Sequence, residues 1–503
     1  DGGTIKLDGN YPVGTRNVAL GDTALGSITS GAFNNIAIGD AALTSLIDGD
    51  NNVAIGRSAL TSETTGQANT SVGHETLISS NTGSFNTAIG HTALNQNTTS
   101  SNNTAVGYQA GYSNTTGAQN TFIGQGAGDS NTTGSNNTAL GRTSLGANTT
   151  GGYNVALGRD ALYSNTTANE NVAVGYRSMI TNTTGADNTA VGTDSMYDNT
   201  SGQKNAAFGK AALGDNTTGD FNVAIGPYSL RLNTTASSNT AVGYQSLYAN
   251  TTGAENIAIG RSALDANTTA SNNTAVGGAA LGANTTGASN TAIGRQALNA
   301  NTTESNNTAV GYQAGYNSNT TGITALGAYA GQDHTSGAEL TAIGYFAAAD
   351  NTTGGYNVAT GAGSLRLNTT GSYNVATGFH ALYNNTTASN NTAVGYQAGY
   401  LNTTGNRSVF LGHSAGYSTT TAAYTTAIGT DAGRSLTTSN GTFVGANAGR
   451  NTTGDANTFL GCNNAGYGAG YFVTTGSKNT VLGAFHGNQG GLDIRTSSNN
   501  IVL

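Results

Sequence analysis

The sequence has 503 residues and a formal net charge of −8, and only 8% of its residues are charged, against about 25% in an ordinary soluble protein. Lys and Arg form no cluster, which argues against nucleic acid and anionic lipid as partners. Apolar residues come in runs too short to insert into a membrane, and a single cysteine, Cys462, excludes an internal disulfide framework.

Residues 1–16 precede a long array of near-identical repeats and are predicted to be an N-terminal entry segment. The array covers residues 17–483, and the copy from Asn137 to Tyr153 reads NTALGRTSLGANTTGGY. Counting the glycine that recurs in each copy gives about 28 repeats of 17 residues, and 28 × 17 = 476 of the 503 positions. This short period and the Gly- and Thr-rich composition predict an all-β fold, a parallel β-solenoid or β-roll.

Each repeat is predicted to contain two strands and two turns. N-x-A-h-G, where h is Val, Ile or Leu, predicts one strand, and A-L-x-x predicts the second. The glycine after h is expected where the backbone has a positive φ or where another backbone approaches closely. The second corner, N-T-T-G, contains an Asn, a residue that tolerates left-handed geometry, and hydroxyl groups that bond their own backbone.

The h residue and the Leu of the second strand are the only regularly large apolar positions, and we expect them to face each other in a thin core. So small a core per repeat favours several chains packed side by side. The Ala and Gly of the strand would then form a seam between chains, or they simply fit a narrow coil. The core positions are represented by Val106, Leu140, Val174 and Val242 for h, and by Leu145, Leu162, Leu247 and Leu298 for the second strand.

The repeat pattern is lost in residues 484–503, which we interpret as a C-terminal junction segment with a hinge followed by a short apolar strand.

Tyrosine recurs at two fixed distances from the repeat glycine, so stacked repeats would align the rings in columns. Such rings beside Asn and Thr are a candidate contact surface for glycans, and the alternative is packing between repeats or between chains. The candidates are Tyr108, Tyr176, Tyr244, Tyr312 and Tyr396 directly after the glycine, and Tyr112, Tyr248, Tyr316 and Tyr400 five positions after it.

A catalytic motif is present by pattern alone. GHSAG at residues 412–416 matches the nucleophile elbow G-x-S-x-G. The same place in other repeats reads GRSAL or GQGAG, so we interpret Ser414 as a repeat residue. We expect no enzyme activity.

Metal ligands and cofactors are not expected either. His74, His91 and His413 directly follow the repeat glycine, and a ring of three in an oligomer could bind a metal, but we interpret them as solvated. Asp48 and Asp50 lack the spacing of a calcium loop. Many corners also match N-x-[ST], which we attribute to turn chemistry rather than to glycosylation.

The N-x-A-[VI]-G-x-x-[AS] repeats of residues 17–483 resemble the head repeats of trimeric autotransporter adhesins. This resemblance implies a left-handed parallel β-roll in three side-by-side chains, that is, a homotrimer. The 17-residue length and the added N-T-T-G corner depart from that family. LDIRTSSNNIVL at the C-terminal end resembles the junction that precedes a trimerising chaperone domain in bacteriophage tail fibres, and the NTAVGYQAG-type repeats are similar to those of tail fibres.

Together the resemblances imply the structural shaft of a phage tail fibre in the virion tail. Such a shaft mediates attachment to a host surface glycan or outer-membrane receptor, and further fibre or baseplate segments are expected at its ends. The alternatives are a bacterial surface adhesin or extracellular filament with the same repeats, and a polysaccharide-degrading tailspike.

Overall fold

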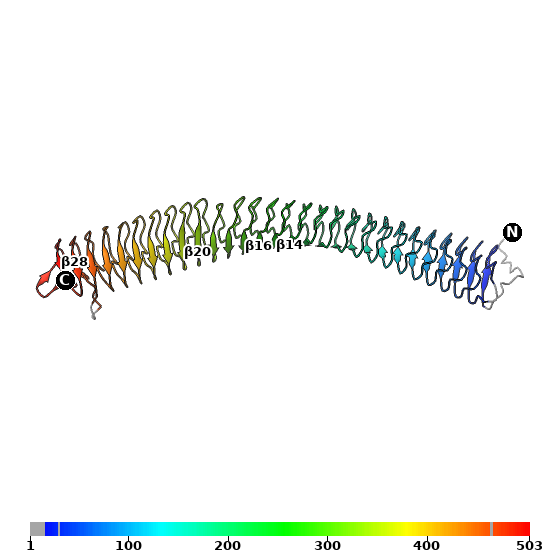
Figure 1. The fold of residues 1–503 in the computed structure, drawn as a ribbon, viewed down its shortest axis with the longest axis horizontal. Coiled ribbons are helices and arrows are strands. Elements are labelled where there is room, and N and C mark those ends of the chain that lie inside the picture. Colours follow the sequence, from blue (N-terminus) through cyan, green and yellow to red (C-terminus); the bar gives the residue numbers. More distant parts are fainter. Residues whose placement is uncertain (1–15, 29–30, 463–465) are drawn as a thin grey trace, which may run out of the picture. The chain divides into compact units, whose positions relative to one another are not determined.

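A computed structural model describes residues 16–28, 31–462 and 466–503, and the chain divides into two compact units, Asp1–Ala254 and Glu255–Leu503. The predicted entry segment lies outside the described residues except for Arg16. The described residues are all-β, with about 28 solenoid turns of about 17 residues, and successive strands follow one another in sequence order (Figure 1). The predicted parallel β-solenoid is therefore confirmed. None of these residues forms a helix of the length and apolarity that a membrane span requires.

The described residues of the first unit form fourteen strands, and each of β1 to β13 pairs in parallel with the next one along the chain. Their bounds are β1 (Val18–Leu20), β2 (Ile36–Ile38), β3 (Val53–Ile55), β4 (Thr70–Val72), β5 (Thr87–Ile89), β6 (Thr104–Val106), β7 (Thr121–Ile123), β8 (Thr138–Leu140), β9 (Val155–Leu157), β10 (Val172–Val174), β11 (Thr189–Val191), β12 (Ala206–Phe208), β13 (Val223–Ile225) and β14 (Thr240–Val242).

The strands of the second unit have the following bounds. They are β15 (Ile257–Ile259), β16 (Thr274–Val276), β17 (Thr291–Ile293), β18 (Thr308–Val310), β19 (Thr324–Leu326), β20 (Leu340–Ile343), β21 (Asn357–Thr360), β22 (Val375–Thr377), β23 (Thr392–Val394), β24 (Val409–Leu411), β25 (Thr426–Ile428), β26 (Thr442–Val444), β27 (Thr458–Leu460), β28 (Thr480–Leu482), β29 (Asn488–Gln489), β30 (Leu492–Asp493) and β31 (Ile501–Val502).

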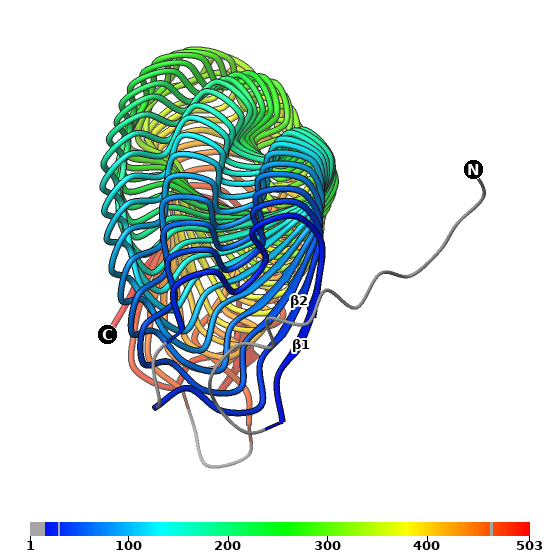
Figure 2. The same cartoon turned by 90° about the vertical axis from the view of Figure 1, so that its right-hand side faces the viewer.

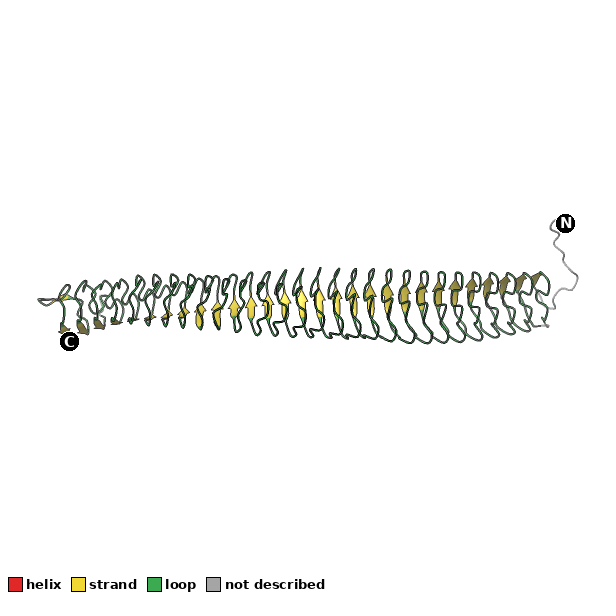
Figure 3. Cartoon of the chain, turned by 90° about the horizontal axis from the view of Figure 1, so that it is seen from above, coloured by secondary structure: helices red, strands yellow, loops and turns green. Residues whose placement is uncertain are grey.

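In this unit each of β15 to β27 pairs in parallel with the next strand along the chain. The junction segment, 484–503, contains the hairpin of β29 and β30 and the short strand β31, which pairs in parallel with β28. Figure 3 shows the strands of each unit as a row of arrows, and Figure 2 views the turns end-on, with β1 and β2 along one side.

Each turn contains one strand rather than the two that we predicted. The segment after the repeat glycine holds two residues with left-handed backbone, such as Thr143 (φ 53°) and Leu145 (φ 54°), which curl the chain into successive turns. The segment still stacks on its neighbour, because the amide of Leu145 donates to the carbonyl of Ala161 at 2.9 Å. Stacking between turns thus continues outside the strand, but without extended backbone.

The strand faces the opposite way from our prediction. In β8 the central Ala139 is fully buried, whereas the h residue Leu140 is 45% exposed. Leu145, across the coil, is buried as expected. Successive side chains of a strand point to opposite faces, so a three-residue strand has only one inward side chain. The Leu on the opposite side of the coil leaves space only for a small side chain such as Ala at this inward position. The Ala residues therefore fit a narrow coil, and the predicted seam of Ala between chains is wrong.

Larger residues enter the strand only where the opposite Leu is lost. Phe122 replaces the inward Ala in β7 and is fully buried. The Leu position is glycine both in its own turn, at Gly128, and in the preceding turn, at Gly111. A Cβ at Gly111 would lie 2.7 Å from the Phe122 ring, and one at Gly128 would also run into that ring. Phe410 is enclosed in the same way by Gly399 and Gly416.

The repeat glycine has both properties that the sequence predicted for it. Gly141 has a φ of 141°, which L-residues rarely adopt, and a Cβ there would lie 2.5 Å from the carbonyl oxygen of Gly158 in the next turn. The backbones of successive turns therefore meet directly at this corner.

Two ladders of buried asparagines run through the solenoid. At the N-T-T-G corner, the Nδ2 of Asn148 donates to Asn131 Oδ1 at 2.7 Å and to the carbonyl of Gly151 at 2.9 Å. At the start of the strand, the amide of Asn154 donates to Asn137 Oδ1 at 3.0 Å. The corner Asn thus serves as a buried hydrogen-bonding group, and our prediction that it supplies left-handed backbone is wrong.

Other buried polar residues occupy the corner ladder where Asn is missing, namely Glu63, Ser80, Ser318, His334, Thr419 and Thr452, and two of them are ionisable. Glu63 accepts hydrogen bonds from Ser80 Oγ at 2.6 Å and from the amide of Gly66 at 2.7 Å. His334 Nδ1 accepts from Asn351 Nδ2 at 2.8 Å. Burial raises the pKa of Glu63 and lowers the pKa of His334, because it disfavours the charged form of each side chain.

We expect Asn148→Ala to destabilise the first unit by about 1–3 kcal/mol, because it removes the buried hydrogen bonds that Asn148 donates to Asn131 Oδ1 and accepts from Asn165 Nδ2. Thr150→Ala, two residues along the same corner and exposed, is the control and should change the unfolding free energy little. Chemical denaturation of both variants measures the difference. Equal stability of the two variants would show that the ladder contributes nothing.

Candidate binding surface

Equivalent residues of successive turns form columns, and the nine candidate tyrosines belong to two of them. We call the position directly after the repeat glycine the corner column and the position five residues after it the side column. The five corner tyrosines are between 38% and 47% exposed, and the four side-column tyrosines are half-buried. The five candidate corner tyrosines recur at every fourth or fifth turn, and of the corner positions between them only Tyr345 is also a tyrosine.

In the corner column, two of the predicted tyrosines belong to aromatic stacks. His91 stacks on Tyr108 with ring centroids 5.5 Å apart. In the second unit, Tyr396 lies between Phe379, at 5.5 Å, and His413, at 5.0 Å, with interplanar angles of 11° on both sides. Both faces of the Tyr396 ring are therefore covered by neighbouring turns.

In the side column, one of the predicted tyrosines is stacked. Tyr400 lies between Tyr383, at 5.4 Å, and Tyr417, at 5.1 Å, and its ring is nearly parallel to both. The rings are stacked face to face, so their faces cover one another and the edges and hydroxyl groups are the parts left for other contacts. This surface offers a row of hydrogen-bonding groups and aromatic edges rather than open ring faces.

The other candidate tyrosines have different surroundings. Tyr176 lies near two guanidinium groups, of Arg159 at 5.6 Å and Arg177 at 4.7 Å from its ring centroid. Tyr244 and Tyr312 contact a neighbouring tyrosine edge-on. Within the described residues no aromatic or cation–π contact is formed by Tyr112, Tyr248 and Tyr316.

Sequence reasoning missed the basic residues of the side column. The Nη1 of Arg366 donates to the hydroxyl of Tyr383 at 3.1 Å, and the guanidinium of Arg434 lies 5.1 Å from the ring centroid of Tyr417. His380, from the turn of Tyr383, contacts that ring at 4.6 Å. The arginines occupy the same distance from the repeat glycine as the tyrosines, so alignment of the repeats by column, rather than by residue type, would have found them.

A third group of exposed aromatic residues directly precedes the position of the strand asparagine, which is Ser408 or Thr425 in two of the turns, and was also missed. Tyr153 is 64% exposed and has left-handed backbone, with a φ of 59°. Tyr356 and Tyr373 stack at 5.1 Å in the second unit. Arg407 contacts Tyr424 through a hydrogen bond and a cation–π contact. This position carries many residue types, which hid it from a search for recurring tyrosines.

The positive charge of Arg366 affects its aromatic neighbours. Burial, and then the charge of Arg366, lower the pKa of His380 below its ordinary value of 6.5. The neutral imidazole is therefore favoured between Tyr383 and Arg366.

The residues of the GHSAG motif are parts of a solenoid turn. Ser414 is buried and has left-handed backbone, with a φ of 53°, and its amide donates to the carbonyl of Tyr396 in the preceding turn. His413 belongs to the corner-column stack. In the parts of the chain that the structure describes, no three His, Cys, Asp or Glu side chains are grouped so that they could hold a metal ion.

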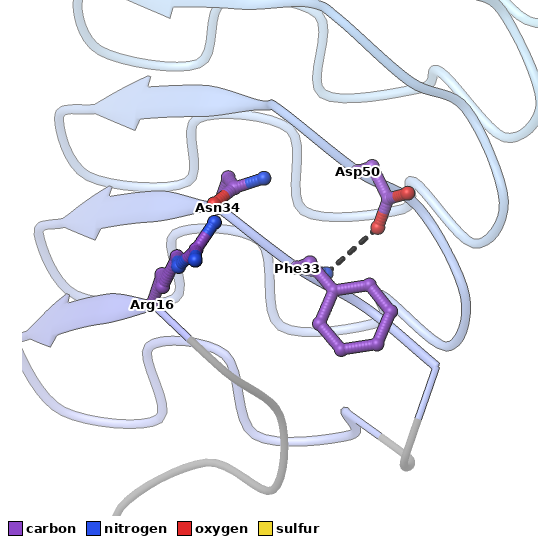
Figure 4. Close-up of a pocket in the computed structure, with 4 residues that line it drawn as sticks. All are labelled: Arg16, Phe33, Asn34 and Asp50. Atoms are coloured by element: carbon purple, nitrogen blue, oxygen red, sulfur yellow. Dashed lines mark hydrogen bonds between the residues drawn. The ribbon is translucent and has the colours of Figure 1, made fainter.

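A cavity of about 400 Å³ lies beside the first turns and is lined by Arg16, Phe33, Asn34 and Asp50 (Figure 4). The amide of Phe33 donates to Asp50 Oδ1 at 2.7 Å, which holds two adjacent turns together. The polar groups that line the cavity thus take part in the stacking of the turns.

Comparison of the chain with protein-family models and with curated proteins gave no match.

We expect Arg366→Gln to raise the pKa of His380 toward its ordinary value of 6.5, because the neighbouring positive charge is removed while burial remains. His380 has a lower pKa in the folded state than in the unfolded state, so the unfolded chain binds a proton more readily. As the pH falls below the unfolded pKa, this difference decreases the free energy of unfolding. The variant should weaken this acid destabilisation. Arg407→Gln, beside Tyr424, is the control, and NMR titration of His380 measures both. An unchanged or lower pKa in Arg366→Gln would contradict the assigned contact.

Proposed function

We propose that the chain is the structural shaft of a homotrimeric phage tail fibre that mediates attachment to a host-cell surface. The observation that carries this proposal is the outer face of the strands, which has no charged residue in either unit and a large apolar h side chain in nearly every turn. The first and third residues of each strand core, such as Thr138 and Leu140, point outward, and the h position is large and apolar in 26 of the 28 turns, all except Thr360 and Thr377.

Parallel sheets are normally covered on both faces. Here the inner face of each strand is covered by the coil itself, and the outer face is left half-exposed, as at Leu140, Ile225 and Leu411. No Asp, Glu, Lys or Arg occurs at either outward strand position in the 28 turns. A surface of this kind with the same pattern in every turn fits a second and third copy of the same chain.

The remaining parts of the proposal rest on resemblance. The likeness of the repeats to the heads of trimeric autotransporter adhesins supports three chains. The likeness of the NTAVGYQAG-type repeats and of LDIRTSSNNIVL to phage tail fibres supports a place in the virion tail. In this proposal the receptor is a glycan or an outer-membrane protein of the host.

We expect the double variant Leu140→Glu and Leu157→Glu to weaken assembly of the trimer, because these residues are adjacent on the outer strand face and burial of unpaired carboxylates is costly. Thr150→Glu and Thr167→Glu introduce the same charges at exposed corners of the same two turns and should leave assembly unchanged. Sedimentation equilibrium measures the mass of each. A wild-type protein that is a folded monomer, or a trimer insensitive to the strand-face variant, would contradict the proposal.

Attachment is tested with a shortened fibre on the particle that carries it. Residues 171–238 make up 68 residues, or four complete turns, and their removal keeps the register of the repeats. We expect adsorption to the host bacterium to be retained, because these turns are a spacer with counterparts elsewhere in the chain. Loss of adsorption by a shortened fibre that still forms trimers would contradict the role of this part as a spacer.

A further inference from the structure

The side column of the second unit contains an unbroken series of tyrosine and arginine over six successive turns, and Tyr471, ten residues after Gly461, continues it in the next turn through its contact with Arg450. We define this series as the Arg–Tyr column, and its members are Arg366, Tyr383, Tyr400, Tyr417, Arg434, Arg450 and Tyr471. Every member is half-buried. In the first unit the side column holds mixed residue types, so this feature is confined to one part of the chain.

The column is joined through side-chain contacts from one end to the other. Tyr383, Tyr400 and Tyr417 form the central stack. Arg366 donates to Tyr383 Oη at 3.1 Å on one side of this stack, and the guanidinium of Arg434 lies 5.1 Å from the Tyr417 ring on the other.

Beyond the stack, Asp431 links the next two arginines. Its carboxylate lies 2.8 Å from Arg434 Nη1 and 3.6 Å from Arg450 Nη2. Arg450 Nη1 in turn donates to the hydroxyl of Tyr471 at 3.2 Å. Asp431 therefore faces two guanidinium groups, and Asp350 interacts electrostatically with Arg366, so three arginines of the column are balanced by two carboxylates.

The charge of this part of the chain is opposite to that of the whole. Residues 350–478 contain five basic residues, Arg366, Arg407, Arg434, Arg450 and Lys478, and three acidic ones, Asp350, Asp431 and Asp455, which gives 5 − 3 = +2. The chain as a whole carries −8, so the remaining residues carry −8 − 2 = −10. A local excess of positive charge on an acidic protein favours an anionic partner.

We propose that the Arg–Tyr column binds a linear acidic polysaccharide that lies along the solenoid. This inference rests on the proposed role in attachment and names the class of ligand and the surface that contacts it. Guanidinium groups pair well with carboxylates, and the hydroxyl groups of the tyrosines match the hydroxyl groups of sugars. A ligand with a regular repeat suits a surface that presents similar groups in successive turns, about 4.8 Å apart as neighbouring strands are.

The stacking favours a polysaccharide over a single-stranded nucleic acid. Nucleic-acid bases bind by stacking on open aromatic faces. The Tyr400 ring lies between Tyr383 and Tyr417, and Tyr396 lies between Phe379 and His413, so the ring faces are already occupied. The remaining edges and hydroxyl groups bind through hydrogen bonds and charge, and many weak contacts of this kind gain strength by repetition.

The test measures binding of the full chain to immobilised polygalacturonate, with neutral dextran and double-stranded DNA as comparators. We expect salt-sensitive binding to polygalacturonate that exceeds binding to both comparators. The double variant Arg366→Gln and Arg434→Gln should bind about tenfold more weakly, since each lost ion pair at a surface contributes a few-fold. Arg142→Gln and Arg295→Gln, two exposed arginines outside the column, remove the same charge and should bind as the wild type.

Two further variants separate recognition from stability. Asp431→Asn should strengthen binding, because it releases Arg434 and Arg450 from their carboxylate partner, whereas a purely structural column would gain nothing. Replacement of Tyr383, Tyr400 and Tyr417 by Phe keeps the rings and removes only the hydroxyl groups, and it should weaken binding without loss of the fold.

Equal binding to dextran or DNA, no binding by the wild type, or no response to the arginine and Asp431 variants would overturn the proposal. Sedimentation of the same samples distinguishes this failure from failure of the proposed function. A trimer that does not bind polygalacturonate contradicts only the Arg–Tyr column, and a monomer contradicts the shaft.

Discussion

Direct stacking of backbone on backbone at the corner glycine is the constraint on which the rest of the structure depends. A Cβ at Gly141 would lie 2.5 Å from the carbonyl oxygen of Gly158, so only glycine lets consecutive turns approach this closely. The close approach keeps every strand in register with the next, as in the pairing of Leu140 with Leu157. Register in turn places like residues above one another, which is the condition for the ladder formed by Asn131 and Asn148. Such an array gains its stability from contacts between nearest neighbours.

The narrowness of the coil explains the composition of its core. The apolar part of the interior is small in each turn, where the strand residue Ala139 is matched with Leu145 beyond the corner glycine. The buried Asn137, Ser144 and Asn148 occupy the rest of the interior. Leu145 is bulky and has left-handed backbone, a conformation that costs about 1–3 kcal/mol, and its burial offsets that cost. Where Phe122 enters the strand, glycine at the Leu positions keeps the total volume nearly constant. Packing therefore explains why Gly111 and Gly128 stand where most repeats have Leu.

The sequence was sufficient for the period, the parallel solenoid, the corner glycine and the burial of the Leu column, because each of these follows from strict repetition. It was misleading for Leu140, since a three-residue strand turns two side chains outward and one inward, and the smallest of them is the one that fits. Asn148 was interpreted as a turn residue, because the partners of a buried amide become visible only when adjacent turns are aligned. For the candidate surface, the tyrosine columns were predicted, but Arg366 and Arg434 were not. Both arginines lie five residues after a repeat glycine, as the tyrosines of the side column do, but a search for recurring tyrosines passes over them.

Assembly and recognition, as proposed, would use different sides of the same turn. The outer strand face at Leu411 is apolar and uncharged, whereas Tyr417, six residues later in the same turn, belongs to the Arg–Tyr column beyond the corner glycine Gly412. Chains that associate through their strands therefore need not cover the column. Association also gives each fibre several copies of a surface whose individual contacts are weak, and binding through several copies at once is stronger than any single contact. A repeated fold can in this way support a weak recognition surface without a deep binding site.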